Sequence, residues 1–155
     1  MGQKCNPIGL RLGINRNWAS TWFDEKHFPD RLKEDIILRR YIYKSYESAS
    51  ISNVQIVRTS KKVSITISTS RPGLVIGKGG SEVDSLKKIL KKLIGYEVQV
   101  NVFEVKSPAL VARLVGQGIA QQIEKKINYR RAVKKSIQTT MSVGGLGIRV
   151  RVAGR

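Results

Sequence analysis

The sequence is poor in the residues that most enzymes and metal sites use. Cysteine and histidine each occur once, as Cys5 and His27, and only 11 of the 155 residues are acidic. A single cysteine cannot form a disulfide within the chain, and one cysteine with one histidine cannot form a Cys/His metal cluster. No carboxylate cluster has ligand spacing, and no nucleophile lies beside a base. We therefore expect no catalytic residues, no metal and no cofactor, and the sequence argues against an enzyme such as a nuclease.

Long apolar runs are also missing. No stretch is long enough to cross a bilayer, and the N-terminus lacks the apolar core of a signal peptide. The shortage of cysteine fits a reducing, intracellular compartment. We expect a protein that makes no contact with a membrane.

Positive charge is what the chain has in excess. Its 29 Lys and Arg residues give a net charge of +18, and 41% of the residues are hydrophobic, as in a globular protein. Residues 107–155 contain ten basic residues and one acidic residue, which is half of the net charge on about a third of the chain. Such a field favours polyanions, so nucleic acid is the first partner to consider.

The most informative motif is the tetrapeptide Gly77-Lys78-Gly79-Gly80, which separates two helical patterns. Glycines let a backbone approach another chain closely, and the start of the second helix offers free N–H groups to a phosphate. The spacing fits neither a P-loop nor a dinucleotide fingerprint. A plain helix-to-helix turn is the simplest alternative. The pattern is also that of the G-x-x-G loop of a KH domain, which clamps about four nucleotides of backbone.

The order of elements around this loop supports the KH interpretation. After an irregular arm at 1–29, Asp30 is expected to cap a helix that runs to about residue 48. Alternating apolar residues predict strands at 51–58 and 63–68, joined by a turn at 59–61. A short helix then leads into the loop, and a helix from 81 to about 94 and a strand at 98–104 follow. The order helix–strand–strand–helix–loop–helix–strand predicts an α+β fold with a type II KH domain at 30–106.

Residues 107–155 predict a partial α/β domain. Ser107 and Pro108 suit the start of a helix that reaches about residue 127, although Gly116 and Gly118 lie inside it at a cost of about 1 kcal/mol each. A second helix is expected at 129–143 and a strand at 148–152. Two helices and one strand do not close a core, because the strand has an unpaired edge.

The helix at 129–143 is expected to have two different faces. Its cations fall within an arc of about 140°, with no acid among them, which favours a polyanion contact over an ordinary solvated face. The opposite face is expected to pack. The cations are Arg130, Arg131, Lys134 and Lys135, and the packing face is Val133, Ile137, Thr140, Met141 and Val143.

Several segments together resemble the small-subunit ribosomal proteins of the S-three family, bacterial type. They are G-Q-K-C-N-P-I-G-L-R-L-G-I at the start, W-A-S-T-W-F at 18–23, R-P-G-L-V-I-G-K-G-G at 71–80, Y-R-R-A-V-K-K at 129–135 and G-I-R-V-R-V-A-G-R at 147–155. The family's C-terminal domain continues past the last of these with further strands, so the resemblance implies that this sequence is truncated at its C-terminus or that another chain completes the sheet.

The resemblance implies a protein of the small-subunit head that binds ribosomal RNA, touches neighbouring head proteins and lies on a cytoplasmic or organellar ribosome. It implies that Arg130, Arg131 and Lys134, with Lys135 beside them, contact messenger RNA at the entry channel and help to open its structure. It further implies ribosomal RNA contacts by Lys4, Arg11, Arg16, Arg149, Arg151 and Arg155. The alternative is a free-standing KH protein that binds single-stranded RNA, as an assembly factor or regulator.

For the two tryptophans, Trp18 and Trp22, packing on the KH domain is the favoured expectation.

Overall fold

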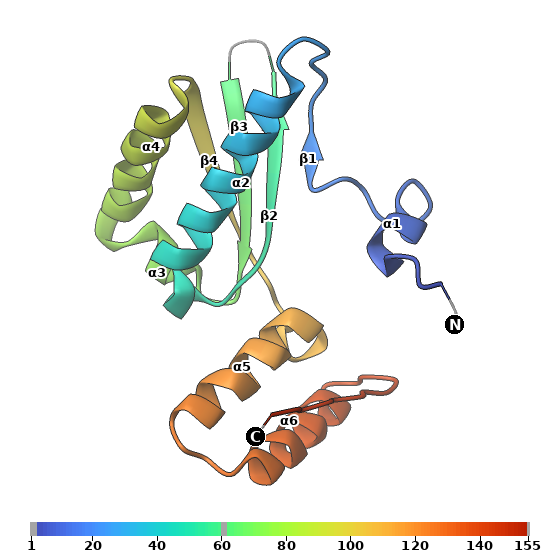
Figure 1. The fold of residues 1–155 in the computed structure, drawn as a ribbon. Coiled ribbons are helices and arrows are strands. Elements are labelled where there is room, and N and C mark those ends of the chain that lie inside the picture. The colour runs from blue at the N-terminus through green and yellow to red at the C-terminus, as the bar shows by residue number, and fades with distance from the viewer. Residues whose placement is uncertain (1–2, 60–61, 155) are drawn as a thin grey trace.

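The computed structural model describes residues 3–59 and 62–154. Two residues of the predicted turn, 60 and 61, lie outside this range. The helices are α1 (Pro7–Arg11), α2 (Phe28–Ser45), α3 (Pro72–Ile76), α4 (Ser81–Ile94), α5 (Ala112–Glu124) and α6 (Tyr129–Ser142), with 3-10 turns η1 (Glu47–Ala49), η2 (Lys78–Gly80) and η3 (Pro108–Leu110). The strands are β1 (Ser20–Thr21), β2 (Ile51–Arg58), β3 (Lys62–Thr69) and β4 (Glu97–Glu104), as Figure 1 shows.

The strands form one sheet in the order β1-β2-β3-β4. β2 and β3 are antiparallel, whereas β1 runs parallel to β2 and β4 runs parallel to β3. In β3 the side chains alternate between buried Val63, Ile65 and Ile67 and the less buried Ser64 and Thr66. This alternation is the period of two that the sequence shows, and it directs one face of the sheet toward the helices.

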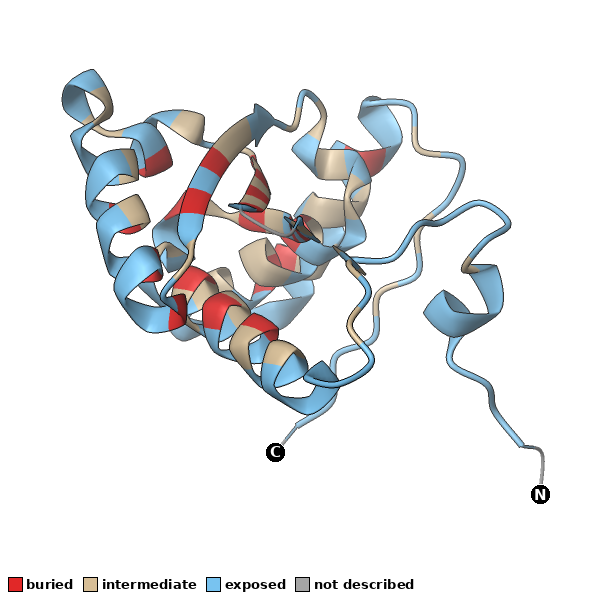
Figure 2. Cartoon of the chain, turned by 90° about the horizontal axis from the view of Figure 1, so that it is seen from above, coloured by how far each residue is buried: buried red, intermediate tan, exposed pale blue. Residues whose placement is uncertain are grey.

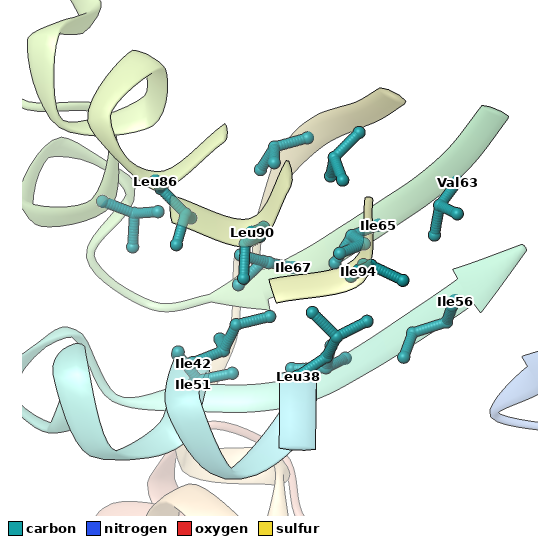
Figure 3. Close-up of a cluster of buried hydrophobic side chains, with 14 of the residues drawn as sticks. Leu38, Ile42, Ile51, Ile56, Val63, Ile65, Ile67, Leu86, Leu90 and Ile94 are labelled. Atoms are coloured by element: carbon teal, nitrogen blue, oxygen red, sulfur yellow. The ribbon is translucent and has the colours of Figure 1, made fainter. Parts of the chain in front are cut away.

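The core lies between that face and the helices α2 and α4 (Figure 3). α2 contributes Leu38 and Ile42, and α4 contributes Leu86 and Leu90; all four are at most 1% exposed. Each such side chain stabilises the fold by about 1.5–3 kcal/mol relative to an exposed one. Leu38 and Ile42 lie four residues apart, as do Leu86 and Leu90, so each pair lies on one face of its helix and faces the core.

The start of α2 differs from the prediction. Asp30 lies inside the first turn and does not cap the helix, because Pro29 occupies a position where helices accept proline and the helix already begins at Phe28. Asp24 stabilises the turn that precedes α2, because Asp24 Oδ1 accepts a hydrogen bond of 3.0 Å from the backbone N–H of His27. This hydrogen bond is the main reason that the pKa of Asp24 lies below its ordinary value.

The arm is fixed to the sheet by a buried carboxylate that the sequence analysis missed. Asp35 is 2% exposed, and its oxygens accept hydrogen bonds from Ser20 Oγ at 2.6 Å, Trp22 Nε1 at 2.9 Å and the guanidinium of Arg58. Arg39 holds the same stretch by donating to Ser20 Oγ and to two backbone carbonyls, those of residues 19 and 54. Charge-assisted bonds of this kind are about twice as strong as neutral ones.

The expectation for the tryptophans holds for one of the two. The indole of Trp22 donates to the buried carboxylate and its ring lies 5.3 Å from the ring of Phe28, centroid to centroid. Trp18 is 66% exposed and does not pack as expected, because β1 begins only after it. The arm also contains the short helix α1, whose Pro7 occupies a first-turn position.

The C-terminal part consists of helices in this structure. The helix expected from residue 108 is divided into η3 and α5, and Ser107 makes no side-chain cap. The strand expected at 148–152 is not formed: within the described residues, 147–154 has no strand assignment and no neighbouring strand. A strand needs a ladder partner for its backbone N–H and C=O groups, and the described sheet ends at β1 and β4.

The two C-terminal helices lie beyond one end of the KH sheet (Figure 1). The guanidinium of Arg113 stacks 4.2 Å from the centroid of the Tyr43 ring, and Gln117 Nε2 donates to the Glu47 carbonyl at 3.3 Å. Figure 2 shows that buried residues are concentrated in the KH part and that the surfaces of the terminal segments are exposed. A cation–π stack and a hydrogen bond are therefore among the contacts that join the two parts. No helix in the described part of the chain is both long and apolar enough to pass through a bilayer.

Candidate nucleic-acid interface

The glycine loop has a backbone that only glycine adopts easily. Gly77 has φ 72° and ψ −177°, and Gly79 and Gly80 have left-handed conformations with φ of 61° and 83°. A β-carbon costs roughly 1–2 kcal/mol in the left-handed region, so the three glycines permit the sharp passage from α3 to α4. Lys78 lies exposed between them. The four predicted loop residues thus form one turn at the start of α4, with Lys78 and Gly79 exposed and Gly77 and Gly80 partly buried.

A carboxylate lies against this loop. A β-carbon on Gly77 would come within 2.5 Å of Cγ of Glu82, so the glycine makes room for that side chain. Glu82 and Asp84 occupy the first turn of α4, where negative charge is favourable to the helix dipole. The negative charge of Glu82 also contributes to the raised pKa of Tyr46, after burial of that phenol. A phosphate at this helix end would meet Lys78 but would be repelled by the two acids.

Helix α6 presents its cations to solvent. Asn128 caps the helix by accepting a 2.9 Å hydrogen bond from the backbone N–H of Arg130, a cap that the sequence analysis did not identify. The four predicted cations are exposed, and none of them forms an ion pair with a described carboxylate. They are Arg130, Arg131, Lys134 and Lys135. The Nε atom of Arg130 donates to Tyr129 Oη at 3.2 Å, which restrains one of these side chains.

The packing face of α6 is narrower than predicted. Ala132 and Thr140 are buried, and Val133 and Ile137 are half-buried. Met141 and Val143 are 47% and 46% exposed, contrary to the expectation that they pack. Met141 lies in the last turn of α6 and Val143 follows its end, next to Gly144 with φ of 94°.

The other predicted RNA contacts lie elsewhere on the surface. Lys4, Arg11 and Arg16 are exposed on the arm, and an Arg11 guanidinium nitrogen donates to the Pro7 carbonyl at 2.9 Å. Arg149 and Arg151 are exposed on the segment after α6, and Arg155 lies outside the described residues. In Figure 1 the helix α1 of the arm lies beyond the β1 edge of the sheet, away from the loop between α3 and α4. The structure therefore groups the α6 cations but does not bring all predicted contacts into one site.

One further cation lies near α6. Arg71, which precedes α3, lines the same cleft as Lys135 of α6. The two are far apart in sequence, and no local pattern could have predicted their proximity. Among the described residues there is no group of three His, Cys, Asp or Glu side chains that could hold a metal ion.

Comparison with known proteins agrees with this architecture. Residues 37–110 match the KH domain family, which confirms the predicted α+β fold with a KH domain. The whole chain is 52% identical to the small ribosomal subunit protein uS3 of Cytophaga hutchinsonii, of which it covers 61%. It is 52% identical to the uS3 protein of Halalkalibacterium halodurans and 47% identical to that of Streptococcus gordonii, and covers 71% of each. The chain belongs to the uS3 family.

Membership in the uS3 family confirms the resemblance seen in the sequence. The relatives carry the name of a ribosomal protein and not of an enzyme, as the sequence analysis predicted. The chain spans between about three fifths and three quarters of the length of these uS3 proteins. The KH match ends at residue 110, so the α6 cations lie outside it.

Proposed function

We propose that the chain is a structural constituent of the small ribosomal subunit in the cytoplasm, where it binds ribosomal RNA and contacts messenger RNA. Family membership supports the ribosomal assignment, and the net charge of +18 supports an RNA partner. We also propose that the chain contacts neighbouring proteins of the subunit head.

The observation that carries the messenger RNA contact is the cationic face of α6. Four exposed cations project from a short helix without a described ion-pair partner, and like charges at this spacing weaken an isolated helix. A polyanion that neutralises these charges removes the repulsion and stabilises the helix. We propose that Arg130, Arg131, Lys134 and Lys135 hold the phosphates of incoming message at the entry channel. Holding one strand there assists the opening of structured message. The work comes from translocation, so this chain needs no chemistry of its own.

The other predicted sites take supporting roles in the proposal. The glycine loop Gly77, Lys78, Gly79 and Gly80 admits an RNA backbone closely, with Lys78 as its charge, although Glu82 limits how strongly a phosphate binds there. The exposed cations of the arm and of the C-terminal segment contact ribosomal RNA. These are Lys4, Arg11, Arg16, Arg149, Arg151 and Arg155.

The decisive experiment compares translation of structured and unstructured messages. Ribosomes carrying Arg130→Ala, Arg131→Ala and Lys134→Ala should slow on a message with a stable hairpin and should translate an unstructured message at the normal rate. A control with Lys88→Ala, Lys91→Ala and Lys92→Ala removes the same charge from α4 and should slow neither. Equal slowing on both messages would show that the α6 cations serve assembly.

Co-sedimentation separates the proposal from the free-standing KH protein. At moderate salt the protein should sediment with small subunits. If it is absent from the subunits and still binds short single-stranded RNAs, the ribosomal proposal is wrong and the alternative takes its place.

A further inference from the structure

A cleft of about 290 Å³ lies where the KH part meets the two C-terminal helices. Its walls come from the ends of the strands, from η3 and from both α5 and α6. This size is near the lower limit of small-ligand pockets, and it is enough for one nucleotide unit. The cleft is distinct from the glycine loop and borders the cationic face of α6 at Lys135.

Gly118 leaves space at the wall of this cleft. It lies in the middle of α5, where glycine is the poorest residue after proline for helix formation. A β-carbon built on Gly118 meets no described atom within 4 Å, so packing inside the protein does not require a glycine. Gly116, two residues earlier, is equally open but does not line the cleft. The space beside Gly118 is therefore available to an occupant from outside.

The α6 side of the cleft offers hydrogen-bond acceptors. Ser136 Oγ donates to the Ala132 carbonyl at 2.9 Å, and Thr139 Oγ1 donates to the Lys135 carbonyl at 3.0 Å. Because a hydroxyl has one proton, these oxygens have only lone pairs left for a ligand. They suit a ligand that carries hydroxyl or amino donors.

The charge of the cleft is positive. Arg71 and Lys135 are its charged residues, and no Asp or Glu is among the described side chains that line it. The ligand should therefore combine hydrogen-bond donors with negative charge. A ribonucleotide has both, because its phosphate is anionic and its 2′-hydroxyl is a donor.

We propose that this cleft binds one ribonucleotide of an RNA strand, with Arg71 and Lys135 as counter-charges of the phosphate and with a ribose hydroxyl donating to the α6 hydroxyl oxygens. The inference rests on the proposed RNA binding and deepens it. The strand that lies on the α6 cations continues into the cleft, toward the KH part. The 2′-hydroxyl gives the protein a preference for RNA over DNA of the same sequence.

The test measures the binding of a fluorescent 12-nucleotide unstructured RNA, and of its deoxy counterpart, by anisotropy. The unmodified protein should bind the RNA about fivefold more tightly, the factor expected from one hydrogen bond. Gly118→Leu fills the cleft and should abolish this preference by weakening RNA binding. Gly116→Leu makes the same change outside the cleft and should keep it. Thr139→Val removes an acceptor at nearly constant volume and should also reduce the preference.

The possible outcomes separate the cleft from the general proposal. If Gly118→Leu binds RNA like the unmodified protein, or if RNA and DNA bind equally well to the unmodified protein, the cleft is not a ribonucleotide site. If both leucine variants weaken binding equally, the effect belongs to the helix and the inference is wrong. A loss of RNA binding on replacement of the four α6 cations, with no effect of Gly118→Leu, would leave the proposed function standing and refute the cleft alone. If the folded protein binds no RNA, both fail.

The strand in the cleft is either message or ribosomal RNA, and the same chemistry serves both. Messages containing 4-thiouridine, bound to subunits that carry the protein, distinguish them. A crosslink between message and the α5–α6 peptide assigns message to the cleft. A crosslink of that peptide to ribosomal RNA alone assigns ribosomal RNA.

Discussion

The buried carboxylate of Asp35 provides the sharpest test of how the fold is held together. Its oxygens receive hydrogen bonds from the arm, through Ser20 and Trp22, and from β2, through Arg58. Asp35→Asn keeps the size of the side chain and removes its charge. The guanidinium of Arg58, whose side chain is only 6% exposed, would then be a buried cation without its main partner.

The expected loss of stability is large. Removing one member of a buried ion pair costs about 3–5 kcal/mol, because the remaining charge is uncompensated. Domains of this kind are stable by about 5–15 kcal/mol, so the change removes about a fifth or more of the total. Glu34→Gln is the matched control, because Glu34 also pairs with Arg58, at 2.6 Å, but its side chain is 24% exposed. This more exposed pair should contribute less than about 1 kcal/mol.

Urea denaturation monitored by tryptophan fluorescence measures both variants. With an m-value of about 2 kcal/mol/M, Asp35→Asn should lower the midpoint by roughly 1.5–2.5 M, and Glu34→Gln by less than about 0.5 M. Equal shifts for the two variants, or a shift below about 0.5 M for Asp35→Asn, would refute the view that this carboxylate anchors the arm.

Three further predictions concern other contacts. Gly77→Ala should lower the free energy of unfolding, measured in urea, by about 1–3 kcal/mol, because the backbone conformation of residue 77 is strained for alanine and the β-carbon collides with Glu82. An unchanged urea midpoint would contradict the loop geometry. Because the pKa of Tyr46 is raised, its contribution to stability is fully present below the unfolded pKa of about 10 and decreases as pH rises above it. Tyr46→Phe should therefore flatten the dependence of the unfolding free energy on pH between about pH 9 and 11. The same pH dependence in both proteins would disprove this contribution. Arg113→Ala removes the stacking on Tyr43 and should accelerate proteolysis between η3 and α5, whereas unchanged cleavage would mean that this contact does not hold the helices.

The KH part could be predicted because its elements have strong local patterns. Residues 51–58, in which Val54 and Ile56 lie on one face, form β2 over the predicted range, and the glycine loop separates α3 from α4 where expected. In β2 and β3 the apolar residues that define the pattern, such as Val54, Ile56 and Ile65, also fill the core, so the local signal and the tertiary result coincide there. The helix α6 was predicted to within one residue of its observed end, although Met141 and Val143 of its apolar pattern are exposed.

Features that depend on contacts between distant residues were not predicted. β1 has two residues and exists only because β2 lies beside it. Asp35 gave one usable signal, since it shares the buried face of α2 with Leu38 and Ile42, where a charge is unexpected without a partner. The strand expected at 148–152 was wrong for the opposite reason: its alternation is clear, but among the described strands none lies next to it. Alternation indicates which residues can pair and does not supply the partner.

The anchoring of the arm has a consequence for the order of events during synthesis. Ser20 of β1 pairs with Ile56 of β2, and the carboxylate that holds the arm also requires Arg58. A chain emerging from its N-terminus presents residues 3–27 first, yet their docking site is complete only after β2 has been made. Until then the arm exposes Ile8, Leu10 and Ile14, which remain 53–82% exposed even in the finished fold. Limited proteolysis of stalled nascent chains should show protection of Trp22 only once residue 58 is free to fold. The arm is thus synthesised before β2 but can reach its place only after β2 has been made.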